Sequence, residues 1–572
     1  MKSNKLFLVW ALVIVFIALR STACAQSELA PWGNMTGIRI DGQLMEFETS
    51  ISVVTDWSSI KSTGKEKQRP HYMRKGTEQT VITSIDSLTF TETVADSETG
   101  SAKLNVQVSA RDDASGDIYL AIGVLEKYYS NGSLQADNLK PQLCSSGVDQ
   151  LNKYAGATMH LLRFISARQQ LLLHFDEPTA VVIRNEAGHL RFYVPIHAGK
   201  LSKGGGAQKN IRITASGIID KSPVSLRVNT TKQGREFIGF GGNFRLQNPK
   251  ADTQVIDYCL ENMRVAFGRV EMPWRFWQPE KAGNPIDSAK TGKLHPAVEH
   301  AMLMAQRLSK KNIPVILSAW SAPAWAVIGK PKFGPGPDGV WGNPLNGDNM
   351  QEIYKSIADY ITYLRDQYKV EVGYFSFNES DLGINIRQTG EEHAALIKGL
   401  GSYFEKAGLK TKLLLGDNSD ATTYEFIYPA LKDSSTHKYI GAVSFHSWRG
   451  WEKETLQKWA DAATKLNLPL IVAEGSIDAQ AWGYPAIFEE PVYAREEINL
   501  YTRLLAICQP AAILQWQLTS DYSPLSGGGV FGNYSDSLHP TQRFWNLKQL
   551  ASTPAGLKYI DAVSDKDLVT IA

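Results

Sequence analysis

The chain has 572 residues, of which 43% are hydrophobic and 21% are charged, so composition excludes a disordered protein and predicts two or three globular domains. Its 60 basic and 58 acidic residues leave a net charge of +2, which excludes the strongly one-signed surface typical of partners of nucleic acid or anionic membranes. The count of 14 tryptophans is high, and their flat rings suit both core packing and stacking on sugars.

The first 25 residues have the pattern of a secretory signal. Lys2 and Lys5 precede an apolar run from 6 to 19, which is short for a membrane span, and Ala23-Cys24-Ala25 offers a cleavage site between small residues. We therefore expect export to the periplasm, the extracellular space or the outer surface. Cys24 is alternatively the site of a lipid anchor, although Ser21 replaces the leucine usual before such a cysteine. No later stretch of the sequence is long and apolar enough to span a bilayer.

The remaining cysteines are Cys144, Cys259 and Cys508, which are far apart and form no Cys-x-x-Cys or disulfide-rich pattern. Cys259 and Cys508 lie in apolar stretches with helical spacing, and we predict that both are buried thiols.

Residues 27–232 alternate apolar and polar side chains, as half-buried strands do, with turn-forming stretches between them. A β-sandwich-like domain is predicted here, and it either binds carbohydrate or supports the rest of the protein. The strands expected in this region are 88–94, 104–108, 118–124, 171–175, 190–194 and 224–228.

Residues 233–555 alternate strands with helices, which predicts a parallel sheet. Eight strand–helix units in this length are typical of a (β/α)8 TIM barrel, an α/β fold. Apolar stripes at helical spacing begin at Val298 and at Ile353. Residues 556–572 are expected to add a C-terminal strand, with 568–571 as its best candidate. The expected barrel strands are 238–242, 265–272, 315–319, 372–377, 413–416, 442–445, 470–473 and 512–518.

Two of these strands end in glutamate. The fourth ends at Asn378-Glu379 and the seventh at Glu474. Glutamate is poorly tolerated in a core, and the active site of a TIM barrel forms at the carboxyl ends of its strands. Each glutamate alone is compatible with a surface or helix-capping acid, but the pair on these two strands predicts an active site.

Two facing carboxyl groups suit the cleavage of a glycosidic bond. The leaving oxygen needs a proton, and the oxocarbenium-like transition state needs a negative neighbour or a nucleophile. A separation of about 5–5.5 Å predicts retention of the anomeric configuration, and one of about 6.5–9.5 Å predicts inversion. The sequence does not give this distance.

The barrel region resembles the large clan of retaining glycosidases that place Asn-Glu after the fourth strand and a nucleophilic Glu after the seventh, and within it glycoside hydrolase family 30. Three motifs carry the resemblance, which covers roughly residues 237–552. They are Phe240-Gly-Gly-Asn-Phe244, Trp320-Ser-Ala-Pro-Ala-Trp325 and Ser376-Phe-Asn-Glu379. The resemblance implies an enzyme that hydrolyses a poly- or oligosaccharide without a metal or organic cofactor.

It also implies roles for individual residues. Glu379 would be the general acid/base and Glu474 the nucleophile, while Asn378 would hydrogen-bond the 2-hydroxyl of the sugar. Arg269 would keep Glu474 ionised, although a structural ion pair is an alternative. His446 would be a hydrogen-bonding residue after the sixth strand, or a residue of the barrel rim.

Tryptophans are expected at the substrate as well. Trp516 would form the floor of the subsite that holds the cleaved sugar, and Trp320 would contact substrate. Trp320 and Trp325 are alternatively packing residues.

The sequence departs from family 30 in two places. Ser380 replaces the proline that usually follows Asn-Glu, and residues 381–387 are more similar to agarase- or porphyranase-type relatives. The large β-rich region before the barrel is a further difference.

A non-catalytic glycan-binding protein on a glycosidase-like barrel is the alternative function. The presence of both glutamates argues against it. A hydrolase of another chemistry is disfavoured, because the sequence has neither a Gly-x-Ser-x-Gly elbow nor histidines at metal-ligand spacing.

Overall fold

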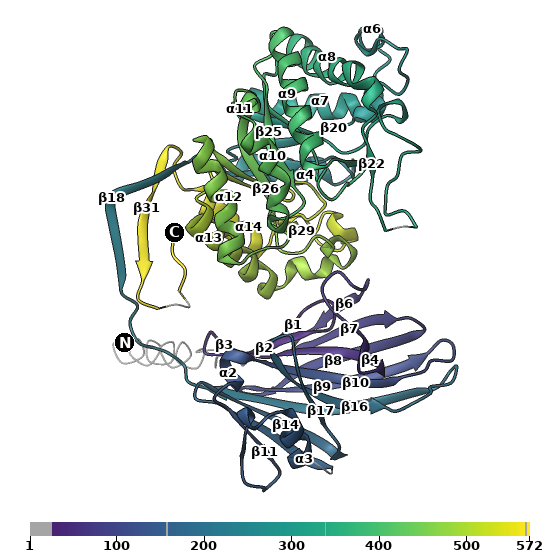
Figure 1. The fold of residues 1–572 in the computed structure, drawn as a ribbon, viewed down its shortest axis with the longest axis vertical. Coiled ribbons are helices and arrows are strands. Elements are labelled where there is room, and N and C mark those ends of the chain that lie inside the picture. The colour runs from purple at the N-terminus through teal and green to yellow at the C-terminus, as the bar shows by residue number, and fades with distance from the viewer. Residues whose placement is uncertain (1–25, 156–157, 338, 567–568) are drawn as a thin grey trace, which may run out of the picture. The chain divides into compact units, whose positions relative to one another are not determined.

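The computed structural model describes residues 26–155, 158–337, 339–566 and 569–572 (Figure 1). The expected export signal and Cys24 lie outside the described residues. The chain divides between Ser222 and Pro223 into two compact units, each described by itself below. Among the described residues, we find no helix whose length and hydropathy would let it cross a membrane.

The first unit is a β-sandwich-like assembly of antiparallel strands, as predicted. Strand β8 (Leu88–Glu98) shows why these residues form it: Leu88, Phe90 and Val94 are buried, and the threonines between them lie on the opposite face. The same alternation of buried and exposed side chains runs along β9, which pairs with β8.

The described residues of this unit form three sheets. The largest has the order β12 (Gln142–Leu143), β11 (Ser133–Ala136), β13 (Met159–Ile165), β14 (Gln169–Thr179), β17 (Gly206–Gly217), β9 (Ser101–Ala110), β8 (Leu88–Glu98), β7 (Glu78–Ile85) and β6 (His71–Lys75). The second has the order β15 (Val182–Glu186), β16 (His189–His197), β10 (Asp117–Leu125), β4 (Glu48–Asp56) and β5 (Ser59–Ser62). The third joins β1 (Gln26–Leu29), β2 (Met35–Ile40) and β3 (Gln43–Glu46), and the unit's short helices include α2 (Glu126–Tyr129) and α3 (Val148–Ala155).

The strand expected at 224–228 does not belong to this unit. It is part of β18 (Leu226–Phe237), which pairs antiparallel with β31 (Leu557–Ser564) in a two-stranded ribbon of the second unit. The domain boundary expected at 232–233 therefore falls inside a strand. The C-terminal strand is β31 rather than 568–571, because residues 569–571 lie in no strand.

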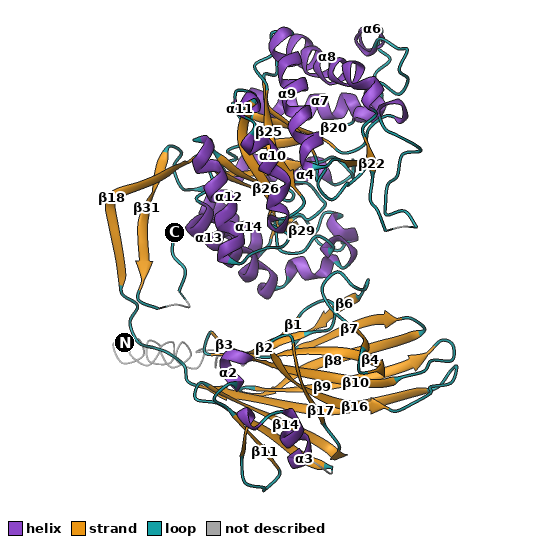
Figure 2. Ribbon diagram, in the orientation of Figure 1, coloured by secondary structure: helices purple, strands orange, loops and turns teal. Residues whose placement is uncertain are grey.

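The second unit contains a closed eight-stranded parallel barrel, which confirms the predicted TIM barrel (Figure 2). All eight expected strands are present, and each pairs with its two neighbours in chain order. They are β19 (Gly239–Phe244), β20 (Gly268–Met272), β21 (Val315–Ala319), β23 (Val372–Phe377), β25 (Lys412–Asn418), β26 (Ile440–His446), β27 (Leu470–Gly475) and β28 (Ala512–Gln515). Short strands in the loops are β22 (Asn343–Pro344), β24 (Ile386–Arg387), β29 (Leu525–Ser526) and β30 (His539–Pro540).

Helices pack around these strands through the apolar stripes read from the sequence. Val298, Met302 and Ala305 are buried on α7, and Ile353 and Ile357 are buried on α8. The longer helices are α4 (Asp252–Asn262), α7 (Pro296–Lys310), α8 (Met350–Tyr368), α9 (Gly390–Lys406), α12 (Lys453–Leu466), α13 (Pro491–Cys508) and α14 (Gln542–Ala551), and the shorter ones are α5 (Trp274–Trp277), α6 (Pro285–Lys290), α10 (Tyr428–Lys432) and α11 (Ser434–His437).

The described cysteines are buried and unpaired. Cys144 lies in the first unit, while Cys259 and Cys508 lie on α4 and α13 of the second, as predicted for buried thiols. Burial raises the pKa of Cys144 and of Cys508 to about 12, so both stay protonated at neutral pH.

Candidate active site

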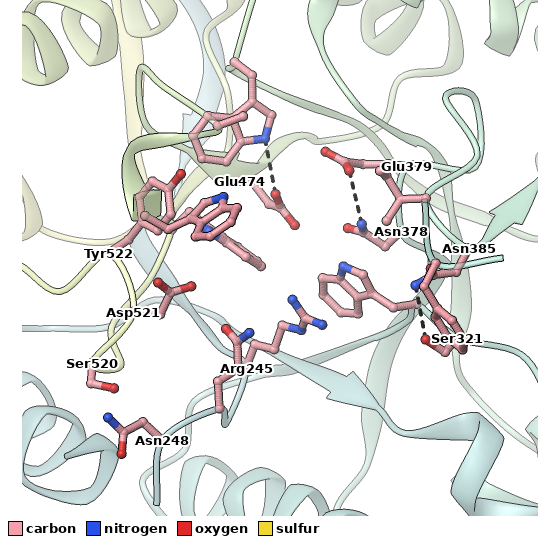
Figure 3. Close-up of a pocket in the computed structure, with 18 of the residues that line it drawn as sticks. Arg245, Asn248, Ser321, Asn378, Glu379, Asn385, Glu474, Ser520, Asp521 and Tyr522 are labelled. Atoms are coloured by element: carbon pink, nitrogen blue, oxygen red, sulfur yellow. Dashed lines mark hydrogen bonds between the residues drawn. The ribbon is translucent and has the colours of Figure 1, made fainter. Parts of the chain in front are cut away.

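Glu379 and Glu474 face one cavity at the carboxyl ends of the barrel strands (Figure 3). Glu379 follows the end of β23, and Glu474 lies near the end of β27. One carboxylate oxygen from each, together with one ring nitrogen of His446, lies within 4.8 Å of the others. The cavity has a volume of about 770 Å³, and Asn378, Trp320 and Trp516 also line it. The fold thus brings the two predicted carboxylates together.

Arg269 joins the strands beneath this cavity. Its guanidinium donates to Glu474 Oε1 at 2.7 Å, to Asp417 Oδ2 at 2.9 Å and to Asn378 Oδ1 at 2.7 Å. The side chain of Arg269 is wholly buried. A buried guanidinium between two carboxylates fixes their positions, because removing any partner would leave a charge uncompensated. Arg269 therefore forms a buried ion pair with both Asp417 and Glu474, and its role in keeping Glu474 ionised stays a prediction.

Asp417 is a site residue that the sequence analysis missed. It lies in β25, where the register shifts between Gly416 and Asn418, and both Gly416 and Asp417 have positive φ values of 101° and 65°. This bulge turns the carboxylate inward, where it accepts from Ser376 Oγ at 2.6 Å and from Arg269. Burial raises the pKa of Asp417, but Arg269 and His446 outweigh burial and lower it well below its usual range.

His446 lies at the end of β26 and connects the three carboxylates. Its Nε2 is 3.0 Å from Asp417 Oδ1, and its Nδ1 is 2.9 Å from Glu379 Oε1 and 3.3 Å from Glu474 Oε2. Burial lowers the pKa of His446, but Glu474 and its hydrogen bonds to Asp417 and Glu379 raise it to about 10. His446 is therefore an imidazolium at neutral pH that donates from both ring nitrogens.

Glu474 is held by cations and by an indole. It accepts from Arg269, and Trp448 Nε1 donates to its Oε2 at 3.3 Å. Burial raises the pKa of Glu474 to about 7, which His446 and Arg269 oppose and Glu379 favours. The two glutamates and Asp417 thus face two cations, and one proton on the glutamate pair makes the cluster neutral.

The cluster formed by Glu379, His446 and Glu474 has the spacing of a metal site. In its imidazolium form, His446 donates from both ring nitrogens to carboxylates. The arrangement is therefore suited to moving protons.

The tryptophans expected at the substrate divide into two groups. Trp320 and Trp516 line the cavity with their ring centroids 6.1 Å apart, and Trp448 and Trp482 line it as well. Trp325 packs against Trp274 and donates to the carbonyl of Gln278, so it has the alternative, packing role.

The structure brings all seven predicted site residues to one place. Those that the sequence analysis missed lie mostly beneath it: Asp417, Asn243, Ser318 and Ser376. These four are small polar residues on β19, β21, β23 and β25, and only their position near strand ends could have indicated them.

Fold and site together define a (β/α)8 barrel with a buried, charge-paired carboxylate cluster at the carboxyl ends of its strands. No protein-family model and no curated protein sequence matches the chain.

Solved structures similar to the chain include a family 30 endoxylanase from Clostridium papyrosolvens, with 16% identity, a TM-score of 0.45 and coverage of 59% of this chain and 78% of that one. SrfJ from Salmonella typhimurium has 14% identity and a TM-score of 0.48, over 63% of this chain and 85% of that one. An endo-β-1,6-glucanase has 16% identity and a TM-score of 0.45, over 62% and 84%.

Proposed function

We propose that the protein is an exported glycoside hydrolase that cleaves O-glycosidic bonds of a poly- or oligosaccharide with retention of configuration. The observation that carries the proposal is the pair Glu379 and Glu474, whose carboxylate oxygens lie within 4.8 Å in a cavity lined by tryptophans. Two carboxylate oxygens within 4.8 Å of each other are closer than the separation of about 6.5–9.5 Å found in inverting enzymes, which favours double displacement. An inverting enzyme needs a larger gap, because a water molecule must fit between substrate and base.

In the first step, Glu474 attacks the anomeric carbon while Glu379 protonates the leaving oxygen. Arg269 and the imidazolium of His446 lower the pKa of Glu474 against the effect of burial, so they favour the ionised form that attacks. The Nδ2 of Asn378 faces Glu379 Oε2 at 3.4 Å, at the edge of the cavity where a sugar hydroxyl would lie.

In the second step, Glu379 takes a proton from water, and the hydroxide displaces Glu474 from the sugar. Glu379 is in its ionised form at this point, because it has given up its proton to the leaving group. The Nδ1 of His446 donates to that carboxylate and so stabilises the base.

Export rests on the sequence pattern of the first 25 residues. The apolar run and the small residues around Cys24 support a secreted or surface-anchored enzyme. Mass spectrometry of the processed N-terminus would separate cleavage after Ala25 from lipidation of Cys24.

The test of activity is reducing-end release from a panel of plant and algal polysaccharides. We expect release by the wild type, loss of release in Glu474→Gln, and a fall of about 10²–10⁴-fold in kcat for Glu379→Gln. The matched control is Glu405→Gln, an exposed glutamate paired with Lys438, which should leave the rate unchanged.

Proton NMR of the first product formed reports the mechanism. The anomer of the substrate should appear first, before mutarotation mixes the two forms. An inverted product would refute double displacement, and tight binding without release would indicate a non-catalytic glycan-binding protein.

A further inference from the structure

Two arginines line the candidate cavity apart from the catalytic cluster. Arg245 follows β19, and Arg275 lies in α5 just after β20. Figure 3 shows Arg245 reaching into the space that Glu379 and Glu474 face. The mechanism proposed above uses neither arginine, so their charge has another role or none.

Arg245 is already neutralised. Its Nε donates to Glu271 Oε2 at 2.8 Å, and its guanidinium lies 5.1 Å from the centre of the Trp320 ring. It contributes hydrogen-bond donors to the cavity wall but little net charge.

Arg275 has no such partner. Its guanidinium lies over the rings of Phe276 at 4.4 Å and Phe333 at 5.2 Å. Within the described ranges, its side chain makes no ion pair and no hydrogen bond. Aromatic faces hold a guanidinium in place without neutralising it and leave its planar fork of donors free for a bidentate anion. Arg275 is thus an exposed cation at the wall of the cavity, in contact with two aromatic rings and with no acidic partner among the described residues.

The cavity also continues past these residues. A second hollow of about 330 Å³ shares Arg245, Gln247, Arg275 and Ser321 with the main cavity. The two arginines therefore stand where the two spaces meet, which is where a glycan longer than the catalytic pocket would pass. The acidic residue of the second hollow, Glu271, is the partner of Arg245.

We propose that Arg275 binds an anionic substituent on the substrate, a sulfate ester or a uronic-acid carboxylate, carried by a sugar near the one that is cleaved. The substrate class is then an anionic polysaccharide. This inference rests on the proposed function, since it assigns a substrate to the same site. A carboxylate and a sulfate ester each present two oxygen atoms that can accept two hydrogen bonds from one guanidinium.

The test uses matched pairs of polysaccharides: a sulfated galactan with its desulfated form, and a glucuronoxylan with its carboxyl-reduced form. The wild type should cleave the anionic member of one pair with a kcat/KM about 10–100-fold above that for the neutral member. Which pair shows the difference identifies sulfate or carboxylate as the ligand.

Arg275→Gln should remove this preference and leave kcat/KM for the neutral member nearly unchanged. Arg275→Lys keeps the charge but loses the stacked fork, so it should retain only part of the preference. The control is Arg365→Gln, whose surface arginine pairs with Asp366 away from the cavity, and which should behave as wild type.

Equal rates on both members of each pair by the wild type would overturn the inference while leaving the glycosidase proposal intact. An equal loss on both members in Arg275→Gln would also overturn it. If no polysaccharide is cleaved, the proposed function fails, and calorimetric binding of the same glycans to Glu474→Gln tests the inference instead. We then expect Glu474→Gln to bind an anionic glycan, and the added substitution Arg275→Gln to weaken that binding at least tenfold. Absence of such binding would refute the inference.

Discussion

Asp417 contacts both cations of the candidate site without lining the cavity. One of its oxygens, Oδ1, accepts a hydrogen bond from His446, and the other, Oδ2, accepts one from Arg269. Ser376 and Ser318 complete its hydrogen bonds, so the carboxylate is fully buried and fully paired. Asp417 is a positioning residue that keeps His446 charged.

The variant Asp417→Asn should lower the pKa of His446 below about 10, because it removes one of the three carboxylates that stabilise the imidazolium, while Glu474 and Glu379 remain. The imidazolium would then lose its proton at a lower pH than in the wild type. We expect kcat to fall as pH rises through neutrality, with KM little changed, in a pH–rate profile.

Asp433→Asn is the control, because Asp433 is exposed and caps a surface helix through Ser435. A kcat for Asp417→Asn that falls equally at all pH values would argue for a merely structural role.

Sequence reasoning found Glu379 and Glu474 because each ends an apolar strand abruptly. It missed Asp417 because Gly416-Asp417-Asn418 has the composition of a turn, so the fifth strand was ended two residues too early. The bulge that turns Asp417 inward depends on pairing with β26, which no local pattern records.

At the scale of elements, a buried ion pair ties α13 to α14. Arg543 donates to both carboxylate oxygens of Glu497, at 3.0 and 2.9 Å, and both side chains are buried. Arg543 also donates to the carbonyls of Tyr522 and Ser523, in the loop after β28. Since Tyr522 lines the cavity, this pair positions one wall of the site.

Arg543→Met should lower the free energy of unfolding of the second unit by about 3–5 kcal/mol, because it leaves the Glu497 carboxylate buried without a cation. Scanning calorimetry would show this as a lower Tm.

The double variant Arg543→Met/Glu497→Gln removes the orphaned charge and keeps an acceptor for Gln515, so it should recover part of the loss. A double variant no more stable than Arg543→Met would show that packing, rather than charge, accounts for the effect.

The barrel strands were predictable because buried parallel strands are short apolar runs, and helices with one apolar face separate them. The ribbon of β18 and β31 was not, because its partners lie more than 300 residues apart and its β18 side chains are nearly all exposed, so neither strand has a core-facing pattern. The expected strand at 224–228 was real, but its assignment to the first unit was wrong.

At the scale of the whole molecule, the first of the two compact units contains a buried carboxyl group that makes its stability depend on pH. In the first unit, Glu92 on β8 is 1% exposed, and neither of its carboxylate oxygens accepts a hydrogen bond within the described residues. Burial raises the pKa of Glu92 well above its usual range, so the folded protein holds a proton that the unfolded chain releases at neutral pH.

Because the folded state binds the extra proton, stability contributed by Glu92 falls as pH rises above about 4.3, the pKa of an unfolded glutamate. Glu92→Gln should therefore raise the Tm of the first unit at pH 7 and leave it nearly unchanged at pH 4, measured by scanning calorimetry. Glu98→Gln, an exposed position on the same strand, is the control. A rise of equal size at both pH values would contradict the titration of Glu92.

The buried cysteines offer a way to measure how often each unit opens. A thiol reagent modifies a buried cysteine only after the structure around it opens, so its labelling rate counts openings of that region. The labelling rate of Cys144 reports opening of the sandwich-like unit, and the labelling rates of Cys259 and Cys508 report opening around two helices of the barrel unit. Comparing these labelling rates would therefore show, without any added probe, whether the two units unfold together or independently.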